Sequence, residues 1–130
     1  MIVALTCIAC LGLLNVGLGF YVSMVRGKTG VMIGVPDDAS HRMTRAVRAH
    51  SNTAEYSAML SVLMYVLATQ GPQTWVLWCM VGATLARCSI VIGLLTGDLG
   101  RPTPARFAGS LGTYIFGIAL SIAMLQLAFS

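Results

Sequence analysis

The first apolar stretch, residues 2–25, sets the strictest limit on how this chain can fold. It contains no charged side chain, and it exceeds the roughly 20 residues with which an α-helix crosses a bilayer. Because backbone N–H and C=O groups must be paired inside lipid, we expect this stretch to be a helix. No basic segment precedes it, so we predict a retained membrane span and not a cleaved signal peptide.

The composition of the whole chain supports a membrane protein. Of its 130 residues, 57% are hydrophobic and 9% are charged, which is outside the range of soluble globular domains. Further apolar runs predict spans at about 45–70, 74–95 and 107–129. We therefore predict an all-α membrane protein, a four-transmembrane-helix bundle that forms a single domain over residues 1–130.

The two longer connections between the predicted spans carry most of the basic residues. These loops, 26–44 and 96–106, contribute with their flanks seven of the eight Lys and Arg, whereas the Gly71-Pro72 turn and both termini have none. The positive-inside rule places both loops in the cytoplasm and both termini outside. Topology thus accounts for the net charge of +4, and we expect no nucleic-acid partner. Trp75 and Trp78, just after the turn, fit an aromatic belt at the far interface.

A row of polar side chains opens the second predicted span. Arg45, Arg48, Asn52 and Glu55 follow one another at steps of three, four and three residues, so a helix places them on one face. In a membrane such a face must meet protein, water or a ligand. The two arginines, one turn apart, favour an anion between them, while Asn52 and Glu55 suit a peptide-like amide and an amine. A small anionic peptide fits this arrangement.

Arg87 is the other charged residue inside a predicted span. With the cytoplasmic boundary near Arg45 on the second span and near Leu95 on the third, a rise of about 1.5 Å per residue places Glu55 roughly 15 Å and Arg87 roughly 12 Å deep. An unpaired charge there costs about 2.5–3.5 kcal/mol. We therefore predict that Glu55 and Arg87 approach each other, within one chain or across a subunit boundary. A purely structural ion pair and a ligand-binding role both remain open.

The cysteines favour packing over chemistry. Cys7 and Cys10 have a Cys-x-x-Cys spacing, but they lie inside an apolar helix, so we interpret them as small hydrophobic residues and keep a redox pair as the alternative. Cys79 and Cys88 have no histidine nearby in sequence. We predict no metal site.

Small and turn-forming residues predict helix contacts and one helix start. Asp37 and Asp38 follow a proline and are predicted to cap the second helix, with a cation site as the alternative.

Glycines and an amide in the first span favour helix packing over catalysis. The packing residues are Gly12, Asn15, Gly17 and Gly19. A stripe of small residues in the fourth span predicts close approach of another helix. It consists of Ala105, Gly109, Thr113, Gly117 and Ser121.

The run Arg45-x-x-Arg48-Ala-His-x-Asn52-x-x-Glu55-Tyr56, at the start of the second of four spans, resembles the MAPEG family. These are membrane-associated proteins in eicosanoid and glutathione metabolism, and the chain is most similar to the small bacterial type. Ala86-Arg87 in the third span and Arg106-x-x-Gly109 in the fourth resemble two further family signatures.

This resemblance implies a homotrimer in a bacterial inner membrane, with glutathione as cosubstrate between neighbouring subunits near the cytoplasmic side and a lipophilic substrate arriving through the membrane lipid. By the resemblance, and for Arg87 by its depth, the glutathione-binding residues are Arg26, Arg48, Asn52, Glu55, Tyr56 and Arg87. Arg106 corresponds to an arginine that stabilises the thiolate of glutathione, with Arg101 as the second choice. A cation beside the sulfur favours the thiolate, which is the nucleophile.

Three positions depart from the family pattern. Ala58 stands where many members have proline, and Ile90 and Leu94 stand where leukotriene-forming members have tyrosines. Three functions therefore remain open: a glutathione transferase or peroxidase, a catalytically silent glutathione- or lipid-binding scaffold, and a small proton-coupled exporter that uses Glu55.

Overall fold

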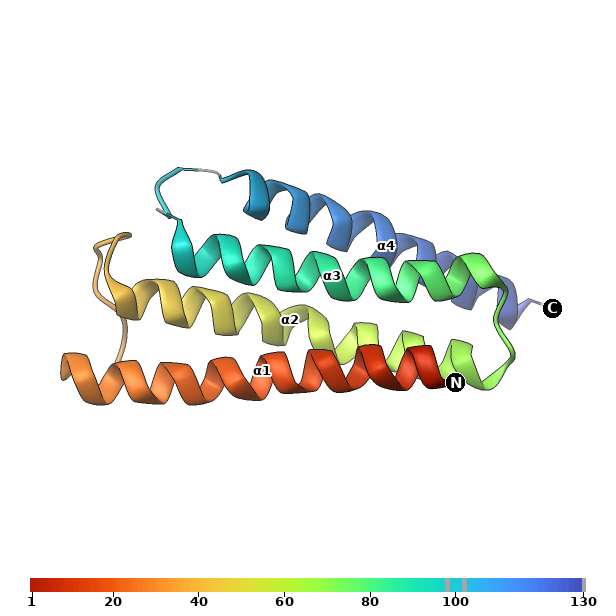
Figure 1. Cartoon of the computed structure of the whole chain (residues 1–130), viewed down its shortest axis with the longest axis horizontal. Helices are drawn as coiled ribbons and strands as arrows, with labels where there is room; N and C mark the ends of the chain where they lie inside the picture. The colour runs from red at the N-terminus through yellow and green to blue at the C-terminus, as the bar shows by residue number, and fades with distance from the viewer. Residues whose placement is uncertain (98, 102, 130) are drawn as a thin grey trace.

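The computed structural model is a bundle of four helices joined in an up-and-down order. It describes residues 1–97, 99–101 and 103–129; residues 98 and 102 of the predicted second loop, and residue 130, lie outside the described part. The helices are α1 (Ile2–Thr29), α2 (Arg42–Thr69), α3 (Thr74–Thr96) and α4 (Pro104–Ala128). They run side by side, and the N-terminus and the C-terminal end of α4 lie at the same end of the bundle (Figure 1). The predicted all-α four-helix bundle is confirmed, and the homotrimer stays a prediction.

The helices extend beyond the predicted spans where polar residues continue them. α1 runs four residues past residue 25, and α2 and α4 each begin three residues before the predicted spans. At the start of α4 the side chain of Thr103 accepts a hydrogen bond from the backbone N–H of Arg106, and Pro104 occupies the first turn. Both are typical of helix starts. Hydrophobicity therefore marks the apolar part of each helix, and capping residues mark its ends.

The prediction that Asp37 and Asp38 cap the second helix is wrong. The N-cap of α2 is His41, whose Nδ1 accepts a hydrogen bond from the N–H of Met43 at 3.1 Å. Asp38 instead accepts from the backbone N–H and the hydroxyl of Ser40, which closes a turn before the helix. These bonds lower the pKa of the exposed Asp38 carboxyl, with the hydroxyl of Ser40 as the largest cause.

The most extensive helix contacts join α3 to α4 and α1 to α2. Gly109 lets α4 approach α3 closely, because a Cβ there would lie 2.5 Å from the backbone nitrogen of Ile90. Thr113, one turn later, is also buried. This half of the small-residue stripe packs on another helix as predicted, and that helix is α3 of the same chain. Ser121, at its other end, is exposed.

The centre of the bundle is apolar. Leu11, Met64, Met80 and Leu120, one from each helix, are fully buried in one cluster. Cys7 joins this cluster, which supports its interpretation as a small hydrophobic residue.

The other polar and small residues of the first span contribute little to packing within this chain. Cys10 is exposed, and all four cysteines are free thiols. Gly12 and Gly17 have open space around them, whereas Gly19 lies against the ring of His50 on α2. The predicted packing role therefore holds within the chain for Gly19 but not for Gly12 or Gly17.

Among the described helices, α1, α3 and α4 are long and apolar enough to cross a membrane. α2 is as long as α1 but is too polar on average to belong to this group. α2 joins the end of α1 to the start of α3 at the opposite end of the bundle (Figure 1). A chain whose α1 and α3 cross the bilayer therefore needs α2 to cross it as well.

Candidate functional site

The polar row on α2 forms one wall of a cavity of about 220 Å³ near the loop end of the bundle. α3 and α4 supply the other walls. The lining residues are Arg48, Ser51, Asn52, Glu55, Ile90, Leu94, Arg106 and Ser110.

The cavity joins residues that are up to 62 positions apart in sequence. Arg48, Asn52 and Glu55 line it from one face of α2, as their helical spacing predicts. Arg106 faces them from the first turn of α4. Arg45 departs from the prediction: it is half-buried, lies outside the lining, and its Nε has no hydrogen-bond partner among the described residues.

Contacts with the second loop hold Arg106 at the edge of the cavity. Its Nη1 donates to the backbone carbonyl of Arg101 at 2.9 Å and to that of Leu99 at 3.3 Å. Arg101 itself is exposed and lies outside the lining. Of the two arginines considered from sequence, the structure thus places Arg106 beside the polar row.

Arg87 lies behind this wall, in the interior of the bundle. Its exposed fraction is 1%. Its Nη2 donates to both oxygens of Asn52, to the backbone carbonyl at 2.8 Å and to Oδ1 at 2.7 Å. Its guanidinium carbon lies 4.9 Å from the centre of the Tyr56 ring, which is within the range of a cation–π contact. Nη1 reaches the hydroxyl of Thr113 at 3.5 Å.

Glu55 lies close enough to Arg87 to interact with its charge, so the predicted approach holds within the chain, but these two described side chains form no direct ion pair. Asn52 and Tyr56, on the side of α2 that faces α3, contact the guanidinium instead, while the side chain of Glu55 is exposed. Pairing across a subunit boundary stays a prediction.

The contact with Arg87 also fixes the orientation of the Asn52 amide. An arginine side chain only donates hydrogen bonds, so the atom of Asn52 that faces it must be the oxygen. The two N–H donors of the amide then remain for a ligand in the cavity that Asn52 lines. Arg87 acts on the cavity through Asn52, without lining it.

An apolar groove of about 340 Å³ adjoins the polar cavity between α2 and α4. Glu55 lines both, and Tyr56 lines the groove alone. The remaining lining residues are Met59, Leu60, Leu63, Thr113, Tyr114, Gly117, Ile118 and Ser121. A polar site and an apolar site thus meet at a single carboxylate.

Arg26 lies apart from these residues in the single chain. Its guanidinium binds carbonyls of the first loop, and it does not line the cavity. Sequence reasoning also missed two hydroxyls of the lining, Ser51 and Ser110. Helical spacing could have found them, because Ser51 follows Arg48 by three residues and Ser110 follows Arg106 by four.

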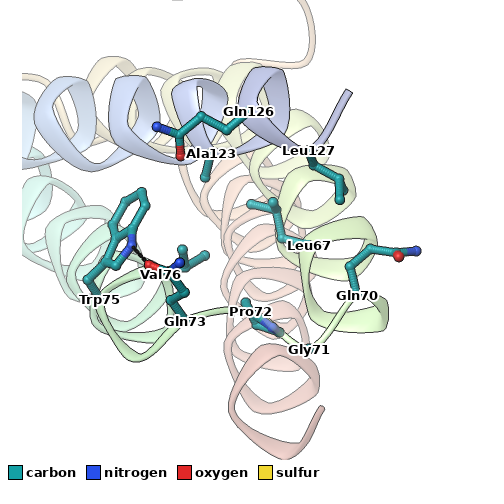
Figure 2. Close-up of a pocket in the computed structure, with 10 residues that line it drawn as sticks. All are labelled: Leu67, Gln70, Gly71, Pro72, Gln73, Trp75, Val76, Ala123, Gln126 and Leu127. Carbon is teal, nitrogen blue, oxygen red and sulfur yellow. Dashed lines mark hydrogen bonds between the residues drawn. The ribbon is translucent and has the colours of Figure 1, made fainter. Parts of the chain in front are cut away.

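A further cavity of about 230 Å³ lies at the opposite end of the bundle, beside the turn from α2 to α3 (Figure 2). The indole N–H of Trp75 donates to the side chain of Gln73 at 2.8 Å, and Gln126 reaches toward the same space from α4. None of its lining residues is ionisable. It therefore offers none of the charges that the polar cavity brings together.

The described residues contain no group of three or more His, Cys, Asp or Glu side chains that could hold a metal ion. The candidate site is thus built from arginines, an amide, a carboxylate and hydroxyls.

A family model of the MAPEG family matches residues 4–126, which include nearly the whole of all four helices. This chain belongs to the MAPEG family. MAPEG proteins include membrane-bound transferases and isomerases related to glutathione. Comparison with curated proteins and with solved structures found no match.

Proposed function

We propose that this MAPEG protein binds glutathione and transfers it to lipophilic electrophiles, or uses it to reduce lipid hydroperoxides. One observation carries the proposal: Arg48, Asn52, Glu55 and Arg106 line one polar cavity that adjoins an apolar groove. Glutathione is an anionic tripeptide with two carboxylates, two amides, an amine and a thiol. The cavity offers complementary groups for a carboxylate, an amide carbonyl, the amine and the thiol.

The polar row assigns a part of glutathione to each side chain. The exposed guanidinium of Arg48 pairs with a carboxylate, since arginine binds carboxylates through two parallel hydrogen bonds. The N–H donors of Asn52 bind a carbonyl or carboxylate oxygen. Glu55 accepts from the amine. Arg87 stabilises this arrangement from behind by holding the oxygen of Asn52.

Arg106 supports the chemistry. A guanidinium beside the sulfur favours the thiolate, which attacks the electrophile. With a chlorinated nitrobenzene, a C–S bond forms, chloride leaves with its bonding electron pair, and the thiol proton passes to water. With a lipid hydroperoxide, two glutathione molecules are oxidised to the disulfide while the peroxide is reduced to an alcohol and water.

In the proposed homotrimer, a neighbouring copy of the chain completes each site. A cavity of about 220 Å³ is smaller than the roughly 300–1,000 Å³ of typical ligand sites. Glu55 is also exposed on a helix proposed to span the membrane, where a bare carboxylate facing lipid costs about 2.5–3.5 kcal/mol. A neighbouring subunit that covers this face solves both problems. In the proposed homotrimer Arg26 reaches the site of the neighbouring subunit by exchanging its hydrogen bonds with the carbonyls of its own loop for bonds with glutathione. Both basic loops lie on the cytoplasmic side of a bacterial inner membrane.

The apolar groove between α2 and α4 suits the lipophilic substrate. Its lining is dominated by apolar side chains, and it meets the polar cavity at Glu55. A substrate that enters from the membrane lipid can keep its apolar part in such a groove while its reactive atom approaches the sulfur. The proposal therefore explains why the two sites adjoin.

Binding and turnover test the proposal separately. Purified protein should bind glutathione in calorimetry and should be stabilised by it on heating. Turnover with a chlorinated nitrobenzene or a lipid hydroperoxide should fall about 100-fold or more in Arg106→Ala, as for loss of one group that stabilises developing charge. Arg101→Ala, just before α4 and outside the cavity, is the matched control. Equal activity of the two variants would exclude the role of Arg106, and no glutathione binding by the wild type would exclude the site.

One observation favours a second candidate, a glutathione- or lipid-binding scaffold without catalysis. Ile90 and Leu94 line the polar cavity at the positions where leukotriene-forming members carry tyrosines, so those two hydroxyl groups are missing from it. Glutathione binding without measurable turnover on either substrate class would select this candidate.

A further inference from the structure

Two tyrosines form a hydrogen-bonded pair in the apolar groove between α2 and α4. Tyr56 on α2 and Tyr114 on α4 both line this groove, and their ring centres lie 6.4 Å apart at an angle of 59°. A hydrogen bond joins their side chains, and the hydroxyls are the only polar atoms that these side chains have. A bond between two hydroxyls uses one of their two protons. One phenolic proton of the pair is therefore left for a bound molecule.

The surroundings of the two rings indicate which phenol presents that proton. Tyr56 is half-buried, and its ring centre lies 4.9 Å from the guanidinium carbon of Arg87. Tyr114 is 53% exposed on the surface that lines the groove. In this arrangement the hydroxyl of Tyr56 donates to that of Tyr114, and the hydroxyl of Tyr114 donates into the groove.

The other two hydroxyls of the groove already serve as donors to their own helix. Thr113 donates to the carbonyl of Gly109 at 2.7 Å. Ser121 donates to the carbonyl of Gly117 at 2.9 Å. Because each hydroxyl has a single proton, the tyrosine pair supplies the side-chain donor that this groove can offer to a ligand.

The tyrosine pair lies where the groove meets the polar cavity. Glu55, which directly precedes Tyr56, lines both sites. Tyr114 follows the first residue of α4, Pro104, by ten positions, so at about 1.5 Å per residue it lies roughly 15 Å from the start of the helix. This depth is far from the interfaces where tyrosines form aromatic belts. Farther along the two helices the lining is mostly apolar, with Met59, Leu60, Leu63 and Ile118. A lipid whose apolar part fills the groove can thus hold a polar atom beside Tyr114.

The geometry points to Tyr114 as the catalytic acid in the reduction of lipid hydroperoxides, an inference that rests on the proposed binding of glutathione. The glutathione thiolate attacks the terminal oxygen of the hydroperoxide, so an S–O bond forms and the O–O bond breaks. The bonding electron pair leaves with the inner oxygen as an alkoxide, which takes the proton of Tyr114 and becomes the alcohol. A second glutathione attacks the sulfur of the resulting sulfenic acid, which gives the disulfide and water. The proton that the first thiol released to water restores the Tyr114 hydroxyl.

The groups behind Tyr114 stabilise the phenolate that forms when its proton leaves. Tyr56 donates to the phenolate oxygen, and Arg87 places a positive charge against the ring of Tyr56. A chlorinated nitrobenzene makes no such demand, because chloride leaves as a stable anion and takes no proton. The tyrosine pair therefore favours hydroperoxides over aryl halides as the substrate class.

The ratio of two activities tests the inference. Tyr114→Phe keeps the aromatic ring and removes only the hydroxyl. We expect its kcat with a fatty-acid hydroperoxide to fall about 100-fold or more, as for the loss of a general acid, and its kcat with a chlorinated nitrobenzene to fall far less. Tyr65→Phe is the matched control, because Tyr65 is also 53% exposed but lines a separate apolar site. Its ratio of activities should equal that of the wild type.

Tyr56→Phe provides a second variant, which also serves if Tyr114→Phe does not fold. It keeps the ring beside Arg87 and removes the donor to Tyr114. Its kcat with the hydroperoxide should fall about 10-fold or more, as for the loss of one hydrogen bond to a charged oxygen, and the ratio of activities should fall with it.

Three results would overturn the inference. An unchanged ratio of activities in Tyr114→Phe would exclude proton donation by its hydroxyl. An equal loss of both activities, with a lower Tm, would make the tyrosine pair a structural contact. Turnover of the chlorinated nitrobenzene by the wild type without any turnover of the hydroperoxide would exclude the reaction and leave the proposed transferase standing. Absence of glutathione binding, in contrast, would overturn the proposed function itself and this inference with it.

Discussion

Replacement of Asn52 by aspartate should separate ligand binding from stability. Asn52 accepts a hydrogen bond from the buried Arg87 through Oδ1, which leaves its N–H donors for a ligand in the cavity that it lines. Aspartate has nearly the same shape and keeps the oxygen that Arg87 binds. It replaces the two donors by a second negatively charged oxygen, which faces Glu55 and the carboxylates of an anionic ligand.

The expected magnitude follows from these contacts. A hydrogen bond to a charged group contributes about 1.5–3 kcal/mol, so loss of the Asn52 donor should weaken glutathione binding roughly 10- to 150-fold. Repulsion between the new carboxylate and the ligand adds to this loss. In the absence of glutathione the variant should be no less stable than the wild type, because the oxygen at 2.7 Å from Arg87 gains a charge of opposite sign.

Calorimetry gives the Kd, and thermal unfolding with and without glutathione gives the stability. Gln70→Glu makes the same chemical change at an exposed position at the opposite end of the bundle, and its Kd should equal that of the wild type. Wild-type affinity in Asn52→Asp would refute the contact between the amide and glutathione. A large fall in the Tm of the ligand-free variant would refute the assigned orientation of the amide.

Three further changes probe packing, the buried cation and the first loop. Gly109→Val should destabilise the bundle by about 1–3 kcal/mol, because a Cβ at this position would lie 2.5 Å from the backbone nitrogen of Ile90. In the control Gly117→Ala the added Cβ would lie 3.8 Å from the side chain of Leu60, an ordinary contact distance, so the Tm should be unchanged. Arg87→Met leaves a buried acceptor unpaired, so the Tm should fall by the equivalent of about 1–3 kcal/mol; an unchanged Kd for glutathione would contradict its positioning role. Asp38 has a pKa below its usual 3.8 in the folded chain, so its stabilising effect is present above 3.8 and is lost as the pH falls through that lower value. Asp38→Asn should abolish this step in an amide hydrogen-exchange profile of the loop, and a step that persists would point to another group.

The sequence predicted the fold well because the bilayer permits few alternatives. Long apolar runs, two basic loops and a Gly-Pro turn were sufficient for four helices in an up-and-down order. Helix starts were harder, because they depend on single side chains. The Asp37-Asp38 pair resembled a cap, yet His41 was the residue whose ring nitrogen reached a free N–H at the start of α2.

The site was predicted in part for a similar reason. Helical spacing correctly placed Arg48, Asn52 and Glu55 on one wall, because the residues of one helix keep a fixed relation to each other. Depth correctly suggested that Glu55 and Arg87 would approach each other, but depth does not specify the direction in which a side chain points around its helix. The rotation of α2 presents Asn52 to Arg87 and turns Glu55 outward, and the packing of α2 on α3 determines that rotation.

The pairing of α1 with α2 bears on how the newly synthesised chain enters the membrane. α2 contains four charged residues within its first four turns, and each costs about 2.5–3.5 kcal/mol near the centre of an isolated span. Residues 2–25 of α1 contain none, and α1 packs extensively along α2. Insertion as a two-helix hairpin lets the apolar helix carry its charged neighbour into the bilayer. Variants in which α1 is shortened should therefore lose the topology of α2, and with it the site. This loss would occur during membrane insertion, before the four helices pack into the bundle.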